Sequence, residues 1–176
     1  MRQLLCLYWI FCSKCFSIFL NTSKFDFPKG PKDVEAVAVD LQEKRAIFLN
    51  KRELPLSLYS VPLFPVDDKI TATEVAELVP VPRYRPDLES LYGRTTRYLG
   101  LPTGMDLFGN KLLVTTLRNA YLYDYSALGL PPKEISLPYV GRREAITFGF
   151  ESGQVAYVSR EREEGTQVAD IFQIRL

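Results

Sequence analysis

The sequence contains no histidine among its 176 residues. This absence excludes Ser-His-Asp and Cys-His catalysis within the chain. It also excludes the zinc, copper and iron sites that depend on imidazole ligands. Any metal would therefore be a hard cation bound by carboxylate and carbonyl oxygens. Acid–base chemistry would depend on Asp, Glu, Lys or Tyr side chains, or on water assisted by an arginine.

Cysteine is nearly as scarce, because Cys6, Cys12 and Cys15 are the only three and all lie near the N-terminus. The rest of the chain therefore folds without disulfides. Cys12 and Cys15 have the spacing of a redox pair, but they lie in an apolar stretch without the preceding strand of a thioredoxin-like context.

Neither sign of charge is in excess, since the net charge is +1. No global field favours a nucleic acid, and none is expected as a partner. Apolar residues make up 47% of the chain and charged residues 24%, which is ordinary for a globular domain. Ten Tyr and eleven Phe favour strands over helices.

Residues 1–20 form an apolar leader that Lys14 interrupts. A secretory signal has a similar basic start and apolar run, but the small-residue cleavage site is missing here. A spanning helix needs about 20 apolar residues, which the leader does not supply without a break. An export signal, a membrane anchor and a leader without function all stay open. The first two favour a periplasmic, extracellular or membrane-anchored location over the cytoplasm. Residues 21–32 are expected to form a polar connector.

An internal repeat organises the remainder. Residues 33–63 contain DVEAVAVD, RAIFLNKR and LSLYSVPL, and residues 143–176 contain EAITFGF, VAYVSRER and ADIFQIRL. Glu35 matches Glu144, and the basic residue that ends the second segment, Lys51 or Arg160, follows at the same distance in both copies. A spacing shared across a whole unit is strong evidence for a repeat.

Short apolar segments predict strands throughout this repeating part. A fourth strand is expected at residues 74–81, with a helix over 72–78 as the alternative. Gly104 takes the place of the repeat glutamate in a middle copy, and residues 108–111 predict a tight turn after its first strand. The other expected strands cover residues 34–39, 46–50, 56–61, 103–107, 111–117, 120–125 and 134–137, with three more within 143–176.

Four-stranded antiparallel units of roughly 40 residues, repeated along a chain, are typical of β-propeller blades. We therefore expect an all-β fold, a partial β-propeller of about three blades, with a β-sandwich as the alternative. The expected blades cover about 33–81, 103–138 and 143–176, and a loop covers 82–102.

Propellers close with about four to eight blades, so three blades leave open edges. Such a chain is either part of a larger propeller or pairs with another copy. A third solution is an N-terminal segment, such as residues 25–27, that supplies the missing outer strand of the last blade.

Two polar stretches and one tyrosine series complete the chain. The loop at 82–102 interleaves arginines with tyrosines. This pattern is typical of a solvated loop, or of a segment that binds phosphate or a single-stranded nucleic acid. The alternating charges at 160–164 predict a solvated hairpin tip. Tyr121, Tyr123 and Tyr125 alternate on one strand and are expected to pack between blades, with their hydroxyls at the rim.

Three pairs of segments resemble bacterial secreted β-propellers of the phytase-like and lactonase-like kind. They are DVEAVAVD with IFLNKR, TGMD with VTTLRNAYLY, and EAITF with VAYVSRE, within residues 28–176. In those proteins a Glu-Ala-hydrophobic phrase opens a blade. Because only about three blades are expected here, the resemblance implies a partial, C-terminal piece of such a propeller.

The first strand of each propeller blade lines the central channel. Carboxylates on these strands are therefore candidates to converge at one mouth of the channel: Asp33, Glu35, Asp106 and Glu144. Such a group can bind Ca²⁺ and position a metal-bound water against a phosphate or lactone ester. Basic partners are expected nearby at the ends of the second strands: Lys51, Arg118 and Arg160.

The same residues fit a purely structural interpretation. Glu35 would pair with Lys51, and Glu144 with Arg160, at partly buried strand ends. The two aspartates would then make only turn hydrogen bonds.

Three functions stay open. Repetition without a catalytic signature favours a non-catalytic module that binds a protein or a small ligand at the channel mouth. The carboxylates and the resemblance indicate a Ca²⁺-dependent, phytase-like or lactonase-like hydrolase. The missing blades indicate a truncated remnant without activity, and open blade edges predict self-association.

Overall fold

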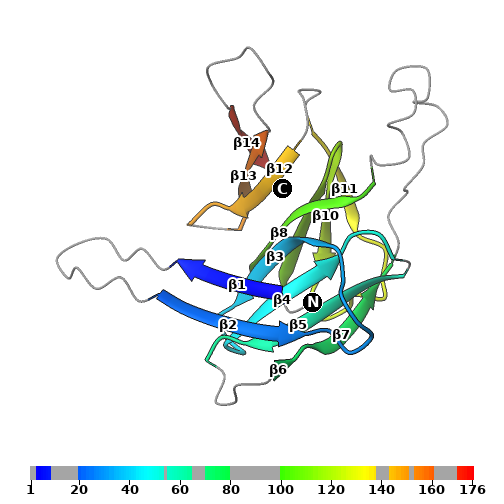
Figure 1. The fold of residues 1–176 in the computed structure, drawn as a ribbon. Helices are drawn as coiled ribbons and strands as arrows, with labels where there is room; N and C mark the ends of the chain where they lie inside the picture. Colours follow the sequence, from blue (N-terminus) through cyan, green and yellow to red (C-terminus); the bar gives the residue numbers. More distant parts are fainter. Residues whose placement is uncertain are drawn as a thin grey trace, which may run out of the picture.

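A computed structural model describes residues 3–8, 20–53, 55–64, 70–79, 100–137, 143–150, 153–160 and 170–176. Within these ranges the chain forms fourteen β-strands joined by turns, and no helix. The strands make four sheets, three of which follow one another along the chain as blades (Figure 1). The all-β prediction is confirmed, and the helix alternative for residues 72–78 is wrong.

Blade 1 is an antiparallel sheet with the order β3-β4-β5-β7. Its strands are β3 (Val34–Asp40), β4 (Arg45–Asn50), β5 (Leu56–Pro62) and β7 (Thr73–Leu78). β4 and β5 are buried along nearly their whole length, because both faces of this sheet are covered. The Asp40 carboxylate fixes the β3–β4 turn, since it accepts hydrogen bonds from Glu43 N at 3.0 Å and from Arg45 Nε at 3.1 Å.

Blade 2 has the corresponding order β8-β9-β10-β11. Its strands are β8 (Pro102–Phe108), β9 (Lys111–Thr116), β10 (Asn119–Asp124) and β11 (Lys133–Ser136). The predicted tight turn after β8 is present, and Gly109 adopts a positive φ of 56° there. Asp124 stabilises the same end of the blade by accepting from Asn110 Nδ2 at 2.5 Å and from Ser126 N at 2.9 Å.

Blade 3 contains three antiparallel strands in the order β12-β13-β14 within the described residues. They are β12 (Arg143–Phe148), β13 (Val155–Arg160) and β14 (Ile171–Arg175). The three strands expected in the last copy are confirmed. In blades 1 and 2 a fourth strand pairs with the third, whereas β14 pairs only with β13 among the described residues.

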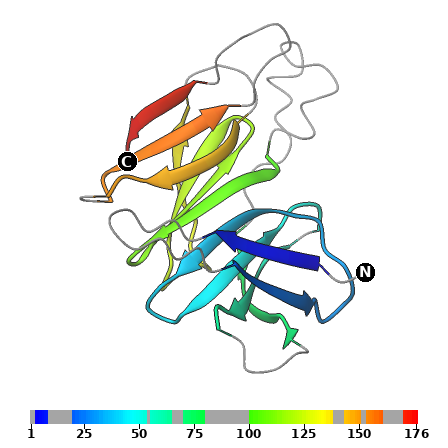
Figure 2. The ribbon, with the colours of Figure 1, turned by 60° about the vertical axis from the view of Figure 1, so that its left-hand side comes forward.

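A small N-terminal sheet lies against blade 1 (Figure 2). It contains β1 (Gln3–Tyr8), β2 (Leu20–Asp26) and β6 (Ile70–Thr71), in the order β1-β2-β6. β6 continues directly toward β7, so one stretch of chain belongs first to the N-terminal sheet and then to blade 1. A strand therefore occupies part of the expected connector at residues 21–32.

The proposed role of residues 25–27 in blade 3 is wrong, because Phe25 and Phe27 pack on blade 1 instead. Their rings lie 4.9 Å from Phe48 and 5.0 Å from Tyr59, respectively. These aromatic side chains are buried, and they close the face of blade 1 that points away from blade 2. The physical reason is the apolar surface of that face, which would otherwise be exposed to water.

The main core lies between successive blades. One cluster joins Ile47, Leu49 and Leu58 of blade 1 to Val114 and Tyr121 of blade 2. A second cluster joins Leu113 and Ala120, on the opposite face of blade 2, to the inner face of blade 3. The packing of Tyr121 and Tyr123 between blades, which the sequence predicted, is confirmed.

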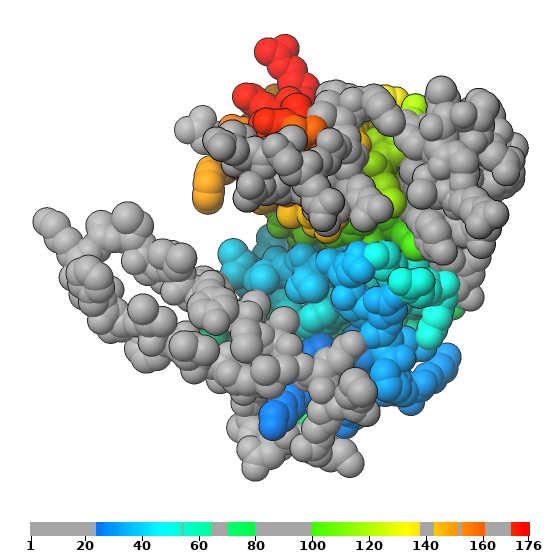
Figure 3. Space-filling model, turned by 45° about the horizontal axis from the view of Figure 1, so that its top comes forward, coloured from blue at the N-terminus to red at the C-terminus, as the bar shows by residue number. Residues whose placement is uncertain are grey.

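The blades are arranged as an arc rather than as two facing sheets. The first strands of the blades lie side by side, β3 next to β8 and β8 next to β12. Figure 3 shows blade 1, blue to cyan, against the green of blade 2, with the red C-terminal strand at the far end. This arrangement is that of a partial propeller of about three blades, and it does not match the β-sandwich alternative.

Several predicted features lie outside the described residues. They are the redox spacing at Cys12 and Cys15, the arginine- and tyrosine-rich part of the loop at 82–99, and the hairpin tip at 161–164. Within the described residues, no helix is long and apolar enough to cross a membrane.

Candidate functional site

The first strand of each blade, which is its inner strand, carries the same irregularity at its start. The pairing register shifts at Glu35 in β3, at Thr103 in β8 and at Glu144 in β12. A β-bulge of this kind places one residue outside the regular ladder and re-aims its side chain. The repeat glutamates are therefore bulge residues, and Thr103 is their structural equivalent in blade 2.

This equivalence corrects two sequence alignments by one residue. Thr103, rather than Gly104, occupies the place of the repeat glutamates. Arg160 lies opposite the residue that begins β12, whereas Asn50 holds the corresponding place in blade 1 and Lys51 follows it. Lys51 and Arg160 therefore take different places in their blades, because the β12–β13 connection is longer than the β3–β4 connection. The equal sequence spacing from Glu35 to Lys51 and from Glu144 to Arg160 does not reveal this difference.

The carboxylates at the start of blade 1 lie in ion pairs. Lys51 Nζ donates to Glu35 Oε2, and Arg52 Nε donates to Asp33 Oδ2. The backbone reinforces this arrangement, because Lys51 N donates to Asp33 O at 2.8 Å. The structure thus forms the Glu35–Lys51 pair that the structural interpretation expected.

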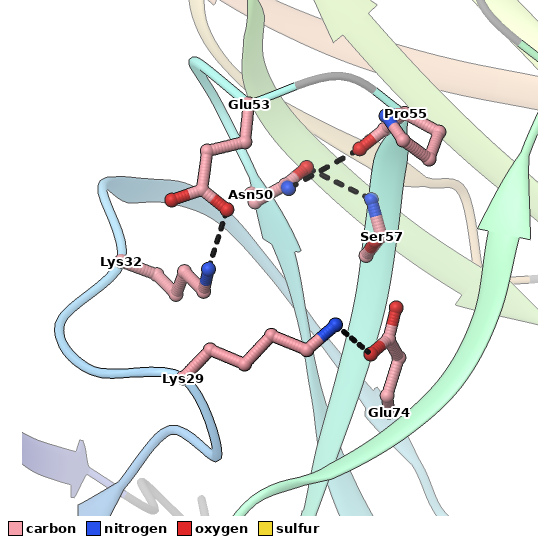
Figure 4. Close-up of polar contacts among 7 residues, drawn as sticks. All are labelled: Lys29, Lys32, Asn50, Glu53, Pro55, Ser57 and Glu74. Atoms are coloured by element: carbon pink, nitrogen blue, oxygen red, sulfur yellow. Dashed lines mark hydrogen bonds and ion pairs between the residues drawn. The ribbon is translucent and has the colours of Figure 1, made fainter.

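Further charged residues lie near β4 and β5 of blade 1 (Figure 4). Lys32, which is 8% exposed, donates to Glu53, and this hydrogen bond raises the pKa of the Lys32 ammonium against the opposing effect of burial. Lys29 lies 4.0 Å from Glu74 of β7. The Asn50 side chain accepts from Ser57 N at 2.9 Å and so holds the β4–β5 connection. These contacts fasten the segment before β3 to β7 and to the β4–β5 connection.

Asp106 connects two blades. Its Oδ2 accepts hydrogen bonds from Phe148 N and Thr147 Oγ1 of β12, both at 2.8 Å. Its Oδ1 accepts from Leu107 N, also at 2.8 Å. Because these donors belong to the inner strands of blades 2 and 3, the carboxylate holds those strands together.

The remaining candidates are distributed around the arc. Glu144 is exposed at the β12 bulge. Arg160 Nη2 lies 2.6 Å from Asp170 Oδ2, at the start of β14. Arg118 lies in the β9–β10 turn, where its backbone N donates to Thr116 Oγ1 at 3.4 Å. The predicted Glu144–Arg160 pair stays a prediction.

Three polar contacts across the blade interfaces were not predicted in detail. Tyr123 Oη donates to Val79 O at 3.1 Å, and Arg45 Nη2 donates to Tyr125 Oη at 3.1 Å. Both join blade 2 to blade 1. Arg143 is 3% exposed, and its Nη1 donates to Leu117 O at 3.1 Å, which joins blade 3 to blade 2. The sequence signal was present for the tyrosines, but nothing marked Arg143 as a buried cation.

Burial raises the pKa of the Tyr123 hydroxyl above its usual value near 10. Burial also raises the pKa of the Tyr125 hydroxyl, although the nearby Arg45 opposes this shift. Both phenols therefore stay protonated at neutral pH, and Tyr123 keeps the proton that it donates to Val79 O.

Across the part of the chain that the structure describes, no group of three or more Asp, Glu or Cys side chains is placed to hold a metal ion. Calcium stays a prediction from the sequence. The geometry instead gives Asp33, Glu35 and Asp106 definite protein partners.

The sheet order and blade packing define the class as an all-β, propeller-type arc whose first strands adjoin. No family model matches the chain, and no curated protein matches it. Among solved structures it is similar to the WD40 domain of Neurospora crassa Pan2, at 12% identity and a TM-score of 0.45. That similarity covers 75% of this chain and 34% of the other, so this chain spans about a third of its length.

Proposed function

We propose that this chain is a non-catalytic interaction module, an open arc of propeller-type blades that binds a partner through its surface. The observation that carries the proposal is that three of the carboxylates predicted to bind Ca²⁺ instead join strands to one another. Asp106 binds one inner strand to the next, and Asp33 and Glu35 bind the ends of two strands within blade 1. These groups act as framework, which leaves recognition to exposed surface and strand edges.

A second observation separates the module from an inactive remnant. Both faces of blades 1 and 2 are covered by apolar clusters, and the N-terminal sheet closes one end of the arc. A chain with such continuous cores is expected to fold cooperatively by itself. Export, which the leader suggested, remains a separate proposal.

Calcium titration tests the module against the hydrolase. The purified chain is melted with and without millimolar Ca²⁺, and its turnover of a phosphate monoester and a lactone is measured in parallel. A ligand that binds only the folded state raises the melting temperature. We expect no shift and no turnover above that of a Glu35→Gln/Glu144→Gln variant. A calcium-dependent shift, together with turnover that this variant loses, would reject the module and support the hydrolase.

A further inference from the structure

We infer that the open edge of β14 receives an extended strand from a partner chain, and that this strand completes blade 3. In the incoming strand a glutamate precedes a branched apolar residue. The inference rests on the proposed function and names the surface that the module would use. It follows from comparing β14 with the third strands of the two other blades.

The three third strands occupy the same place in their sheets. Leu58 of β5, Ala120 of β10 and Ile171 of β14 lie in one row across their blades, at the level where each inner strand resumes regular pairing after its bulge. An aromatic residue follows each of them, Tyr59, Tyr121 or Phe172. Leu58 and Ala120 are fully buried, whereas Ile171 is 71% exposed. Leu58 and Ala120 face the next blade, so the exposure of Ile171 belongs to the corresponding face of blade 3, whereas the open edge of β14 is a property of its backbone.

The backbone of β14 is prepared for another strand. Arg160 N donates to Asp170 O, and Leu176 N donates to Gln154 O, so residues of that parity turn their peptide groups toward β13. The intervening residues then turn their N–H and C=O groups to the other edge, where no described strand pairs with them. Those residues are Ile171, Gln173 and Arg175. Unpaired groups in a regular row are a template for strand addition.

The fourth strands of blades 1 and 2 are bounded by proline, and β14 is not. Pro80 follows soon after β7, and Pro131, Pro132 and Pro138 flank β11. Proline removes a backbone donor and discourages further pairing at an edge. β14 contains no proline, and its register with β13 runs without a bulge. The guarded strands are those that already lie outermost, which indicates that β14 is built to be covered.

The chemistry of the incoming strand can be taken from the strands that fill this place elsewhere. Glu74 of β7 lies opposite Tyr59, and Glu134 of β11 lies opposite Tyr121. A branched apolar residue, Val75 or Ile135, follows each glutamate. The matching place beside Phe172 would thus take a glutamate, and the next residue would lie beside Ile171, as Ile135 lies opposite Ala120. The exposed charge of Arg175 further favours an acidic segment.

The test uses a fluorescent peptide with the sequence of residues 131–138, PPKEISLP, added to the full chain. Fluorescence anisotropy reports binding, and amide hydrogen exchange reports its location. We expect saturable binding, with at least tenfold slower exchange at Ile171, Gln173 and Arg175. A peptide of scrambled sequence should bind at least tenfold more weakly. Binding without protection of these amides, or no binding up to the solubility limit, would overturn the inference.

Two variants sharpen the result. Gln173→Pro removes an N–H that faces the open edge, and we expect it to weaken peptide binding at least tenfold; Gln173→Thr keeps the N–H and should bind like the unmodified chain. Equal binding by the two folded variants would reject strand addition.

Protection of the same amides that rises with protein concentration, without peptide, would identify a second copy as the occupant and reject a partner strand. Failure of the peptide leaves the calcium and turnover assays to judge the proposed function independently.

Discussion

At the scale of single residues, the charged side chains that suggest chemistry in the sequence serve as connections. Asp106 is the clearest case, because a single carboxylate accepts hydrogen bonds from the backbone and a side chain of the next blade. Bonds to a charged acceptor are stronger than neutral ones, and leaving a partly buried N–H without its acceptor is costly.

Asp106→Ala should therefore lower the free energy of unfolding by about 1–3 kcal/mol, since Phe148 N loses its acceptor. Urea denaturation followed by circular dichroism measures this change. Asp33→Ala is the control, because Asp33 pairs with Arg52 in an exposed setting worth at most about 1 kcal/mol. Equal losses for the two variants would show that Asp106 does not join the blades.

Tyr123 gives the contact between blades 1 and 2 a dependence on pH. Its pKa is raised in the folded chain, so the unfolded chain loses the phenolic proton first, near pH 10. The folded state then binds more protons than the unfolded state, and the free energy of unfolding falls as the pH rises above about 10. Below that pH this contribution is constant.

Tyr123→Phe should cost about 0.5–1.5 kcal/mol at pH 7, because the hydrogen bond to Val79 O is lost. At about pH 11 the difference from the unmodified chain should shrink, since the variant lacks the titrating group. Urea unfolding at both pH values measures this. Tyr157→Phe, at a 39% exposed ring, is the control for hydroxyl deletion outside the core. A difference for Tyr123→Phe that is equal at both pH values would contradict the assignment.

At the scale of elements, the strands of the three blades were predictable because alternation and β-branched residues set them locally. The bulges were not, since a register shift depends on how two strands meet, and Glu35 and Glu144 give no local sign of it. The Glu35–Lys51 pair could be predicted from spacing, whereas the bridge from Asp106 to β12 depends on tertiary packing. The N-terminal sheet was missed because β2 is polar over Asn21–Lys24, and the buried Phe25 and Phe27, at its end and just after it, fall where the chain also contains turn signals.

Gly104 sets how closely blades 2 and 3 approach. A Cβ at this position would lie 3.0 Å from Ala145 Cα and 3.1 Å from Ile146 N. The obstructing atoms are backbone, so they cannot rotate away as the end of a side chain would. The absence of a side chain at Gly104 is thus a requirement of the contact between β8 and β12.

Gly104→Ala should destabilise the fold by about 1–3 kcal/mol, as overpacking does. Gly129→Ala is the matched control, because a Cβ there meets nothing within 4 Å. Chemical denaturation of both variants measures the difference. If Gly104→Ala is as stable as Gly129→Ala, the inner strands of blades 2 and 3 are not in contact as described.

At the scale of the whole molecule, the two ends of the arc differ. The N-terminal sheet covers the first blade with Phe25 and Phe27. Blade 3 instead exposes Tyr157 and Ile171 on the face that the other blades bury against a neighbour. Head-to-tail closure of two copies into a ring would require blade 3 to meet blade 1, and the N-terminal sheet occupies that place. The two ends of the arc therefore present different surfaces, and the edge proposed to receive a partner strand lies at the blade 3 end.

Amide hydrogen exchange on the full chain without any added peptide tests this open arc most directly. β5 and β10 have strands on both sides, so successive amides within Leu56–Ser60 and Asn119–Leu122 should all exchange slowly. Along β14 protection should alternate, with Phe172 and Ile174 slow and Ile171, Gln173 and Arg175 fast. Slow exchange at every residue of β14, at all protein concentrations, would contradict an open edge and with it the arc described here.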